Sequence, residues 1–242
     1  MAAAEVVRAS TEAVRENGRF TVALSGGSTP KGLYSLLATD PALREQIPWD
    51  RIHFFWGDER HVAPDHPDSN FRMANEAMLS TVPVGPSQIL RIAGERADAA
   101  TAAREYESAL RDFFHLDDSR FPRFDLVLLG MGPDGHTASL FPNTDAVRED
   151  TRLVVANWVD KFKMYCITLT VRALSNAALV VFLVSGDDKA EMLQAVLHDR
   201  ADRFPASLIR PQDGPPTWLV DKNAARLMVS TVPERDESHP LL

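Results

Sequence analysis

Short apolar segments alternate along the chain with longer segments whose apolar residues recur at helical spacing. The clearest strands are predicted at residues 20–24, 51–56, 124–129 and 179–184. Each is almost continuously apolar, as is typical of a strand that is covered on both faces. Between them, the spacing predicts helices at residues 31–38, 70–79, 97–114 and 189–198. This alternation predicts an α/β fold in which helices cover both faces of a mostly parallel, doubly wound sheet.

Weaker strand patterns occur at residues 153–156 and 167–170, and a late edge strand is predicted at residues 218–220. The chain has 242 residues, a length that single α/β domains commonly reach. Because no repeat, low-complexity tract or linker interrupts the pattern, we expect one domain over residues 1–242.

Composition narrows the class of partner and the compartment. The formal net charge is -8 and the pI is about 5.4, so the surface repels polyanions and nucleic acid is not an expected partner. The single cysteine, Cys166, excludes an intrachain disulfide and fits a reducing compartment. The N-terminal segment lacks the regions of an export signal, and the longest apolar run, residues 177–184, is too short to span a membrane. We therefore expect a cytoplasmic protein with no membrane partner.

In open α/β sheets, ligands bind outside the carboxyl ends of the strands, so functional residues are expected in the loops that follow them. The first such loop is SGGSTP, residues 25–30. Gly26 and Gly27 let backbone N–H groups turn toward an anion, while Ser25, Ser28 and Thr29 add hydroxyl donors at a helix N-terminus. This pattern predicts a phosphate-binding turn, although it matches neither the Walker A motif nor G-x-G-x-x-G. The alternative is a plain turn in which Ser28 or Thr29 caps the helix.

Two further loops carry charge. Asp58 and Arg60 lie in the loop GDER, where charges are costly unless they pair with each other or with a ligand. Arg60 is a candidate for binding a phosphate or a developing oxyanion, and Asp58 for orienting a base or a sugar hydroxyl. Lys189 begins the helix after the strand at residues 179–184 and is a candidate phosphate cation. A solvated turn and a surface lysine are the alternatives.

A glycine-rich loop, GMGPDGHTASLFP, follows the strand at residues 124–129. It brings His136 to the mouth of the sheet. Histidine titrates near neutral pH, so it can take a proton from water and return it to a leaving group. Of the seven histidines, His136 is therefore the predicted catalytic base.

Taken in this order, the loops resemble those of the 6-phosphogluconolactonases, a family related to glucosamine-6-phosphate deaminases and isomerases. The resemblance runs from about residue 20 to residue 228, and its most specific strings are GDERHV and DGHTASLFP. It implies a three-layer α/β/α domain, related to the glucosamine-6-phosphate deaminase and ribose-5-phosphate isomerase folds. It also implies cofactor-free and metal-free hydrolysis of 6-phospho-D-glucono-1,5-lactone in the oxidative pentose phosphate pathway. The expected partner is this small phosphosugar lactone, and we expect a monomer or a weak oligomer.

The resemblance also implies residue roles. By position, His136 matches the catalytic base, with Asp58 and Asp134 in supporting roles. The residues that match substrate-binding elements are Ser25, Gly26, Gly27, Ser28, Thr29, Arg60 and Lys189. We group Arg60 with the catalytic residues because it can stabilise an oxyanion.

One position departs from the family pattern. Members usually have arginine where this chain has Cys166, and in the related deaminases that arginine helps to hold the substrate phosphate. Lys161 or Lys163 could compensate, although an ammonium group cannot reproduce a bidentate guanidinium. Weaker phosphate binding, a changed substrate and reduced activity are all consistent with the departure.

Other functions stay open at this point. A sugar-phosphate isomerase or deaminase is the closest, but such relatives carry a DGHIAFNEP-like segment whose glutamate assists ring opening, whereas TASLFP follows the histidine here. A serine hydrolase lacks its G-x-S-x-G motif, and His61 and His66 lack the H-E-x-x-H spacing of a metal hydrolase. A phosphosugar-binding module with reduced activity is favoured by Cys166 and disfavoured by the retained DGH string.

Overall fold

The computed structural model describes residues 1–198 and 203–228. Its main sheet has five parallel strands in the order β2-β1-β4-β7-β8. Their bounds are β1 Phe20–Leu24, β2 Ile52–Trp56, β4 Leu126–Leu129, β7 Val180–Val184 and β8 Thr217–Val220. Every residue of β1, β4 and β7 is buried, which confirms that their continuous apolar runs mark strands covered on both faces. The predicted late edge strand is β8, which pairs with β7.

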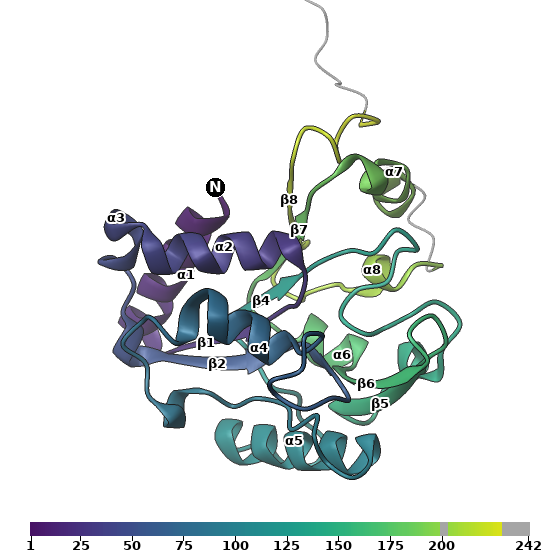
Figure 1. Ribbon diagram of the computed structural model, residues 1–242, viewed down its shortest axis with the longest axis horizontal. Coiled ribbons are helices and arrows are strands. Elements are labelled where there is room, and N and C mark those ends of the chain that lie inside the picture. Colours follow the sequence, from purple (N-terminus) through teal and green to yellow (C-terminus); the bar gives the residue numbers. More distant parts are fainter. Residues whose placement is uncertain (199–202, 229–242) are drawn as a thin grey trace, which may run out of the picture.

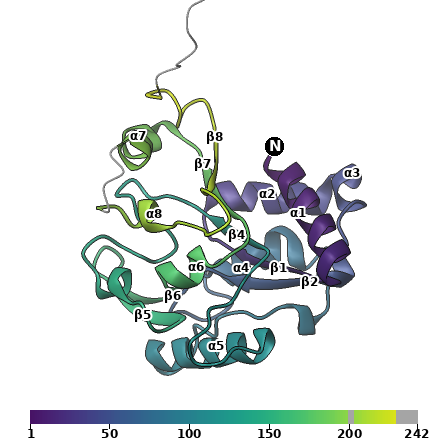
Figure 2. The same ribbon diagram turned by 180° about the vertical axis from the view of Figure 1, so that it is seen from behind.

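Helices lie on both sides of this sheet (Figures 1 and 2). On the side of α1 and α2, Val6 and Tyr34 share an apolar cluster with Phe54. On the side of α5, Phe113 contacts Phe55. Alternate strand residues face opposite sides, so Phe54 and Phe55 mark the two faces, and the predicted three layers are confirmed. The longer helices are α1 Ala2–Asn17, α2 Ser28–Thr39, α5 Ala99–Phe114 and α7 Ala190–His198.

Shorter helical segments join these elements. They are α3 Pro41–Arg44, α4 Asn70–Ala74, α6 Val171–Ser175 and α8 Pro205–Leu208, with 3-10 turns η1 Trp49–Arg51, η3 Pro86–Gln88, η4 Asp145–Arg148 and η5 Asp187–Lys189. The helix predicted at residues 70–79 is α4 followed by one π-helical turn, η2 Asn75–Leu79. Across residues 1–198 and 203–228, none of the helices combines the length and the apolar character that crossing a bilayer requires.

A second, antiparallel sheet has the strand order β3-β6-β5, with bounds β3 Asp58–Arg60, β5 Val154–Val159 and β6 Met164–Leu169. β5 and β6 confirm the two weaker strand patterns. The prediction of a loop at residues 57–60 is wrong, because β3 pairs with residues 166–168 of β6. That partner lies about a hundred residues away in the sequence, and a local pattern does not reveal it.

Candidate active site

A cavity of about 260 Å³ lies at the carboxyl ends of β1, β4 and β7. Every predicted site residue except Asp134 lines it, namely Ser25, Gly26, Gly27, Ser28, Thr29, Asp58, Arg60, His136 and Lys189. A larger hollow of about 840 Å³ lies at the opposite ends of the strands, beside α1, and contains none of these residues. Of its three arginines, Arg8 and Arg123 pair with Glu12 and Asp213, and Arg19 lies over the ring of Phe113. The smaller cavity is therefore the candidate site.

The turn after β1 presents backbone N–H groups at the start of α2. Gly27 precedes the helix with φ 106°, a conformation that favours glycine. No side chain caps α2, so the alternative of a capping role for Ser28 or Thr29 is wrong. Thr29 Oγ1 instead hydrogen-bonds to Ser185 Oγ at 2.6 Å, which joins the turn to the loop after β7. The uncapped N–H groups and the helix dipole can hold an anion here.

Arg60 ends β3 with its guanidinium at the cavity. Its Nη1 donates to Asn70 Oδ1 at 3.0 Å and to the carbonyl of Asp68 at 2.8 Å. Asn70 Nδ2 in turn donates to the carbonyl of Asp58 at 2.9 Å. A Cβ on Gly26 would lie 2.0 Å from Asn70 Oδ1, so only glycine fits there. Asn70 therefore contacts both the arginine and the phosphate turn.

Glu59 is buried beside Arg60 and fixes the start of α4 against β3. Its carboxylate accepts hydrogen bonds from the backbone N–H groups of Arg60, Asn70 and Phe71 at 2.8, 2.7 and 2.8 Å, and from Ser69 Oγ at 3.0 Å. Burial raises the pKa of Glu59, and the hydrogen bonds from these backbone groups oppose the rise. The carboxylate is thus the common anchor of the segment that presents Arg60 and Asn70 to the cavity.

Asp58 lies on the same face of β3 as Arg60. The residue is 6% exposed, and its Oδ2 accepts a hydrogen bond from Ser139 Oγ at 2.6 Å. The carbonyl of Ser139 accepts from Asn157 Nδ2 of β5 at 2.9 Å. The small sheet and the loop that contains His136 are therefore tied together through Asp58, which lines the cavity.

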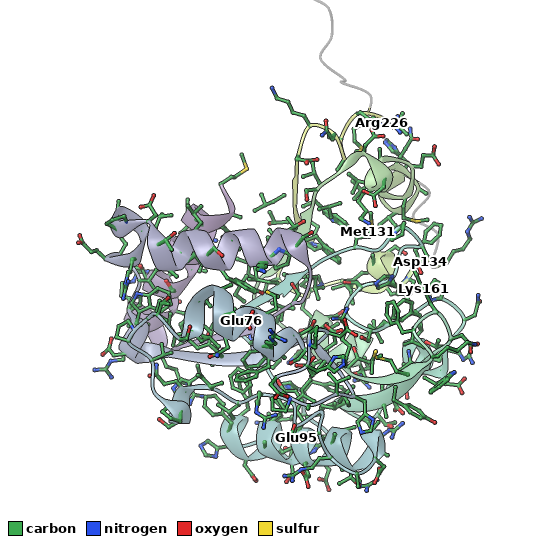
Figure 3. All side chains as sticks on the ribbon, in the orientation of Figure 1. Glu76, Glu95, Met131, Asp134, Lys161 and Arg226 are labelled. Carbon is green, nitrogen blue, oxygen red and sulfur yellow. The ribbon has the colours of Figure 1, made fainter. Side chains whose placement is uncertain are left out.

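The imidazole of His136 is fixed on three sides. Its Nδ1 lies 2.5 Å from Asp134 Oδ1, and its ring stacks on Phe141 with centroids 4.1 Å apart. On the third side the ring lies against Gly132. A side chain there would collide with it, because a Cβ on Gly132 would lie 2.1 Å from Nδ1 and Cε1 of the ring. The loop that carries Asp134 and Met131 follows β4 (Figure 3). Nε2 is left as the ring nitrogen that a substrate can reach.

Asp134 stays ionised beside this imidazole. Burial by itself would raise the pKa of Asp134, but the hydrogen bonds from the Nδ1 and the backbone N–H of His136, with the charge of the ring, bring it below its usual value. The ionised carboxylate of Asp134 accepts a hydrogen bond from the N–H at Nδ1 of His136. When the imidazole is neutral, its lone pair therefore lies on Nε2.

Lys189 lies at the cavity with its side chain 20% exposed. It ends the turn η5, and α7 begins at Ala190, one residue later than the start predicted at Lys189. Its Nζ contacts Asp188 Oδ2 at 2.7 Å, and Asp188 is itself largely exposed. A substrate phosphate would therefore compete with a solvated carboxylate for this ammonium group.

Cys166 is fully buried and packs with Phe141 and Val159. In the register of the small sheet it lies opposite Arg60. Burial, together with the nearby negative charge of Asp58, raises the pKa of the thiol to about 11. The lysines proposed to compensate for the missing arginine, Lys161 and Lys163, are exposed and do not line the cavity that the described residues form.

Comparisons with known proteins show the family of the chain. The family model of glucosamine-6-phosphate isomerases/6-phosphogluconolactonase matches residues 1–218. The chain belongs to this family. It is 44% identical over 216 residues to a 6-phosphogluconolactonase of Synechocystis, covering 88% of this chain and 87% of the relative.

Solved structures of this isomerase/lactonase family share the fold. The 6-phosphogluconolactonase of Trypanosoma brucei matches with a TM-score of 0.83 at 30% identity, covering 94% of this chain and 93% of that one. A monomeric glucosamine-6-phosphate deaminase matches with a TM-score of 0.75, covering 93% and 95%. Its identity is only 23%, so that second likeness shows the fold alone.

Some residues that shape this family member's site escaped the sequence analysis. Asn70, Ser139, Phe141 and Ser185 all contact predicted site residues. Phe141 and Ser139 lie within the DGHTASLFP string, so that string was a signal for them. Asn70 offered none, because it begins a helix and meets Arg60 only through the fold. Within the described part of the chain, no three His, Cys, Asp or Glu side chains gather as metal ligands.

Proposed function

We propose that the chain hydrolyses 6-phospho-D-glucono-1,5-lactone to 6-phosphogluconate, as a 6-phosphogluconolactonase of the oxidative pentose phosphate pathway. The observation that carries the proposal is that His136 and the glycine turn after β1 line the same cavity. The lining of that cavity therefore offers both donors for an anion and a base. The activity of relatives such as the Synechocystis 6-phosphogluconolactonase supports the same reaction.

The phosphate of the substrate binds the turn formed by Ser25, Gly26, Gly27, Ser28 and Thr29, with Lys189 as its cation. Ser25 Oγ is buried and makes no hydrogen bond within the described residues, so a ligand oxygen there would satisfy it. Binding of the phosphate at this turn places C1 of the lactone near His136. Positioning of this kind supplies much of the rate in intramolecular reactions.

Hydrolysis then needs one base and one oxyanion donor. Neutral His136 takes a proton from water through Nε2 as the water oxygen bonds to C1. Arg60 stabilises the negative charge that develops on the carbonyl oxygen. When the bond between C1 and the ring oxygen breaks, the imidazolium returns the proton to that oxygen, which leaves as an alcohol. Asp134 fixes the tautomer and stabilises the imidazolium, and Asp58 binds a sugar hydroxyl.

No metal or cofactor takes part in the proposed steps, so dialysis against EDTA is expected to leave the rate unchanged. We further propose that the described fold is one domain, that the chain acts as a monomer or a weak oligomer, and that it is cytoplasmic. Ultracentrifugation of the purified chain at micromolar concentration tests the oligomeric state.

The decisive experiment is a lactonase assay with freshly generated 6-phosphogluconolactone, corrected for spontaneous ring opening. We expect wild-type turnover and a loss of about 10²–10⁴-fold in kcat for His136→Ala. His198→Ala, at an exposed histidine at the end of α7, is the matched control and is expected to keep full activity. Release of ammonia from glucosamine 6-phosphate without lactone hydrolysis would instead assign the chain to the deaminase branch.

A further inference from the structure

Two buried tyrosines bind the backbone at the carboxyl ends of neighbouring strands. The hydroxyl of Tyr34 accepts from the N–H of Ser25 and donates to the carbonyl of the same residue, both at 3.0 Å. The hydroxyl of Tyr106 bonds in the same way to Trp56, at 2.9 Å from the nitrogen and 3.0 Å from the oxygen. The two phenols thus make the same pair of contacts at two different strand ends.

These contacts lie where the sheet stops providing partners. The register of β1 with β4 ends at Ala23 and Val127, so the backbone of Ser25 has no strand beside it. Trp56 is the last residue of β2, which is an edge strand. Buried backbone groups without a partner are costly. The hydroxyl of Tyr34 therefore extends the hydrogen bonding of β1 by one residue beyond the strand, whereas that of Tyr106 supplies partners to the last residue of the edge strand β2.

The two tyrosines come from opposite layers. Tyr34 belongs to α2 and Tyr106 to α5, and these helices lie on opposite sides of β1 and β2 (Figures 1 and 2). β1 and β2 are paired, with Leu24 opposite Trp56. Burial raises the pKa of both phenols, so each hydroxyl keeps the proton that it donates to the carbonyl.

Each contact immediately precedes a different part of the cavity. Ser25 begins the turn that carries Gly26 and Gly27, whereas Trp56 is followed by Gly57 and then by Asp58 of β3. A hydroxyl that fixes the residue where a strand ends restricts the directions in which the following segment can leave the sheet. The segment after β1 bears the phosphate donors, and the segment after β2 is Gly57 followed by β3, which bears Asp58 and Arg60.

We propose that Tyr34 and Tyr106 are positioning residues, Tyr34 for the phosphate-binding turn and Tyr106 for strand β3, which carries Asp58 and Arg60. This assignment rests on the proposed lactonase function. Removing the hydroxyl of Tyr34 should loosen phosphate binding. Removing that of Tyr106 should disturb the groups that act at C1. The two variants should therefore differ in which kinetic constant they change.

The test compares three tyrosine-to-phenylalanine variants, which together cover all three tyrosines of the chain. Tyr165→Phe is the matched control, because Tyr165 is 46% exposed and its ring packs on Trp158 away from the cavity. For 6-phosphogluconolactone we expect Tyr34→Phe to raise KM by about threefold to tenfold with kcat nearly unchanged, a range set by the loss of net hydrogen bonding. Tyr106→Phe is expected to lower kcat by about the same factor with KM nearly unchanged.

A role confined to folding would lower only the fraction of folded protein in both variants, so kcat per folded chain, with that fraction measured by near-UV circular dichroism, and KM would both stay at their wild-type values. That pattern, or an unchanged KM in Tyr34→Phe, overturns the proposal. If the wild-type chain shows no turnover above spontaneous opening, the lactonase assignment fails instead, and the backbone contacts are then judged by amide exchange.

Hydrogen exchange in the wild-type chain tests the contacts without any variant. The amides of Ser25 and Trp56 should exchange with deuterium as slowly as those in the interior of β1. Exchange at the rate of exposed loop amides would refute the contacts, including in the case where a phenylalanine variant fails to fold.

Discussion

Asp134 holds His136 through a contact of 2.5 Å between Oδ1 and Nδ1. The carboxylate has a side chain that is 38% exposed, so its influence on the ring is weaker than that of a fully buried aspartate. We predict that Asp134→Asn lowers kcat by about 10-fold to 100-fold, less than the loss of about 10⁴-fold seen when a buried serine-protease aspartate is changed. Steady-state kinetics on the lactone measure this, and KM should change little.

The pH dependence of the Asp134 effect follows from its pKa, which lies below the usual value of 3.8. A carboxylate with a lowered pKa makes its contribution above the ordinary pKa and loses it as the pH falls through the lowered one. The Asp134 carboxyl should therefore stay ionised from about pH 5 to about pH 9, as followed directly by carbon-13 NMR of the labelled side chain. A titration step of that carboxyl within this interval would contradict the lowered pKa.

Gly132 permits the close approach of the imidazole. We predict that Gly132→Ala lowers kcat by at least about tenfold, because the new Cβ would overlap Nδ1 and Cε1 of His136 at 2.1 Å and a misplaced base loses rate steeply. Gly130→Ala is the matched control, since a Cβ there meets nothing within 4 Å. Equal kinetics of the two variants would mean that the ring tolerates displacement.

Glu59 is a buried residue that holds the backbone of Arg60 and Asn70 beside the cavity. Glutamine keeps its size, but the amide nitrogen cannot accept from N–H groups, so Glu59→Gln should leave buried donors unpaired and reduce the free energy of unfolding by about 1–3 kcal/mol. We also predict a lower kcat, since Arg60 and Asn70 depend on the same carboxylate. Urea unfolding and kinetics together measure the two effects.

The control for that prediction is Glu149→Gln. Glu149 likewise accepts from loop groups, namely Thr151 and Arg152, but it lies outside the cavity. Its loss should reduce stability without changing kcat or KM. If both glutamine variants lose activity equally, the effect of Glu59 is one of stability alone.

Local pattern was sufficient for the main sheet because four of its five strands, β1, β2, β4 and β7, are almost continuous apolar runs. It was insufficient for β3, whose residues Asp58, Glu59 and Arg60 are all charged. Their strand conformation comes from pairing with β6, and their charges are satisfied by Ser139, by the start of α4 and by Asn70. Non-local partners of this kind are not encoded in spacing along the chain.

The site was predictable to the extent that it is built at strand ends. Because ligands of open α/β sheets bind at the carboxyl ends of the strands, the loops after β1, β4 and β7 were predicted to form one site. The structure places them around one cavity. The residues that hold these loops escaped prediction. In the sequence, Tyr34 and Tyr106 occupy ordinary apolar positions of the predicted helices. Their hydroxyls meet Ser25 and Trp56 only in the folded chain.

The thiol of Cys166 should be inert in the folded chain. Its pKa of about 11 leaves the thiolate about 2–3 orders of magnitude scarcer near pH 8 than that of an ordinary cysteine. We predict slow reaction of the native protein with a disulfide reagent such as DTNB, and rapid release of one equivalent per chain after unfolding in urea, since the chain has one cysteine. Fast labelling of the native chain would contradict the burial.

Placing at position 166 the arginine that the family resemblance implies should not improve the site. Cys166 packs under Phe141, which in turn stacks on His136, and it lies opposite Arg60 in the sheet. An arginine there would displace Phe141 and add a like charge beside Arg60, so we predict that Cys166→Arg lowers kcat and costs about 1–3 kcal/mol of stability through overpacking. Cys166→Ala, which only removes the thiol, should keep kcat. A lower KM for the phosphorylated lactone in Cys166→Arg, at unchanged kcat, would show instead that the new guanidinium reaches the phosphate and that the small sheet can rearrange around it.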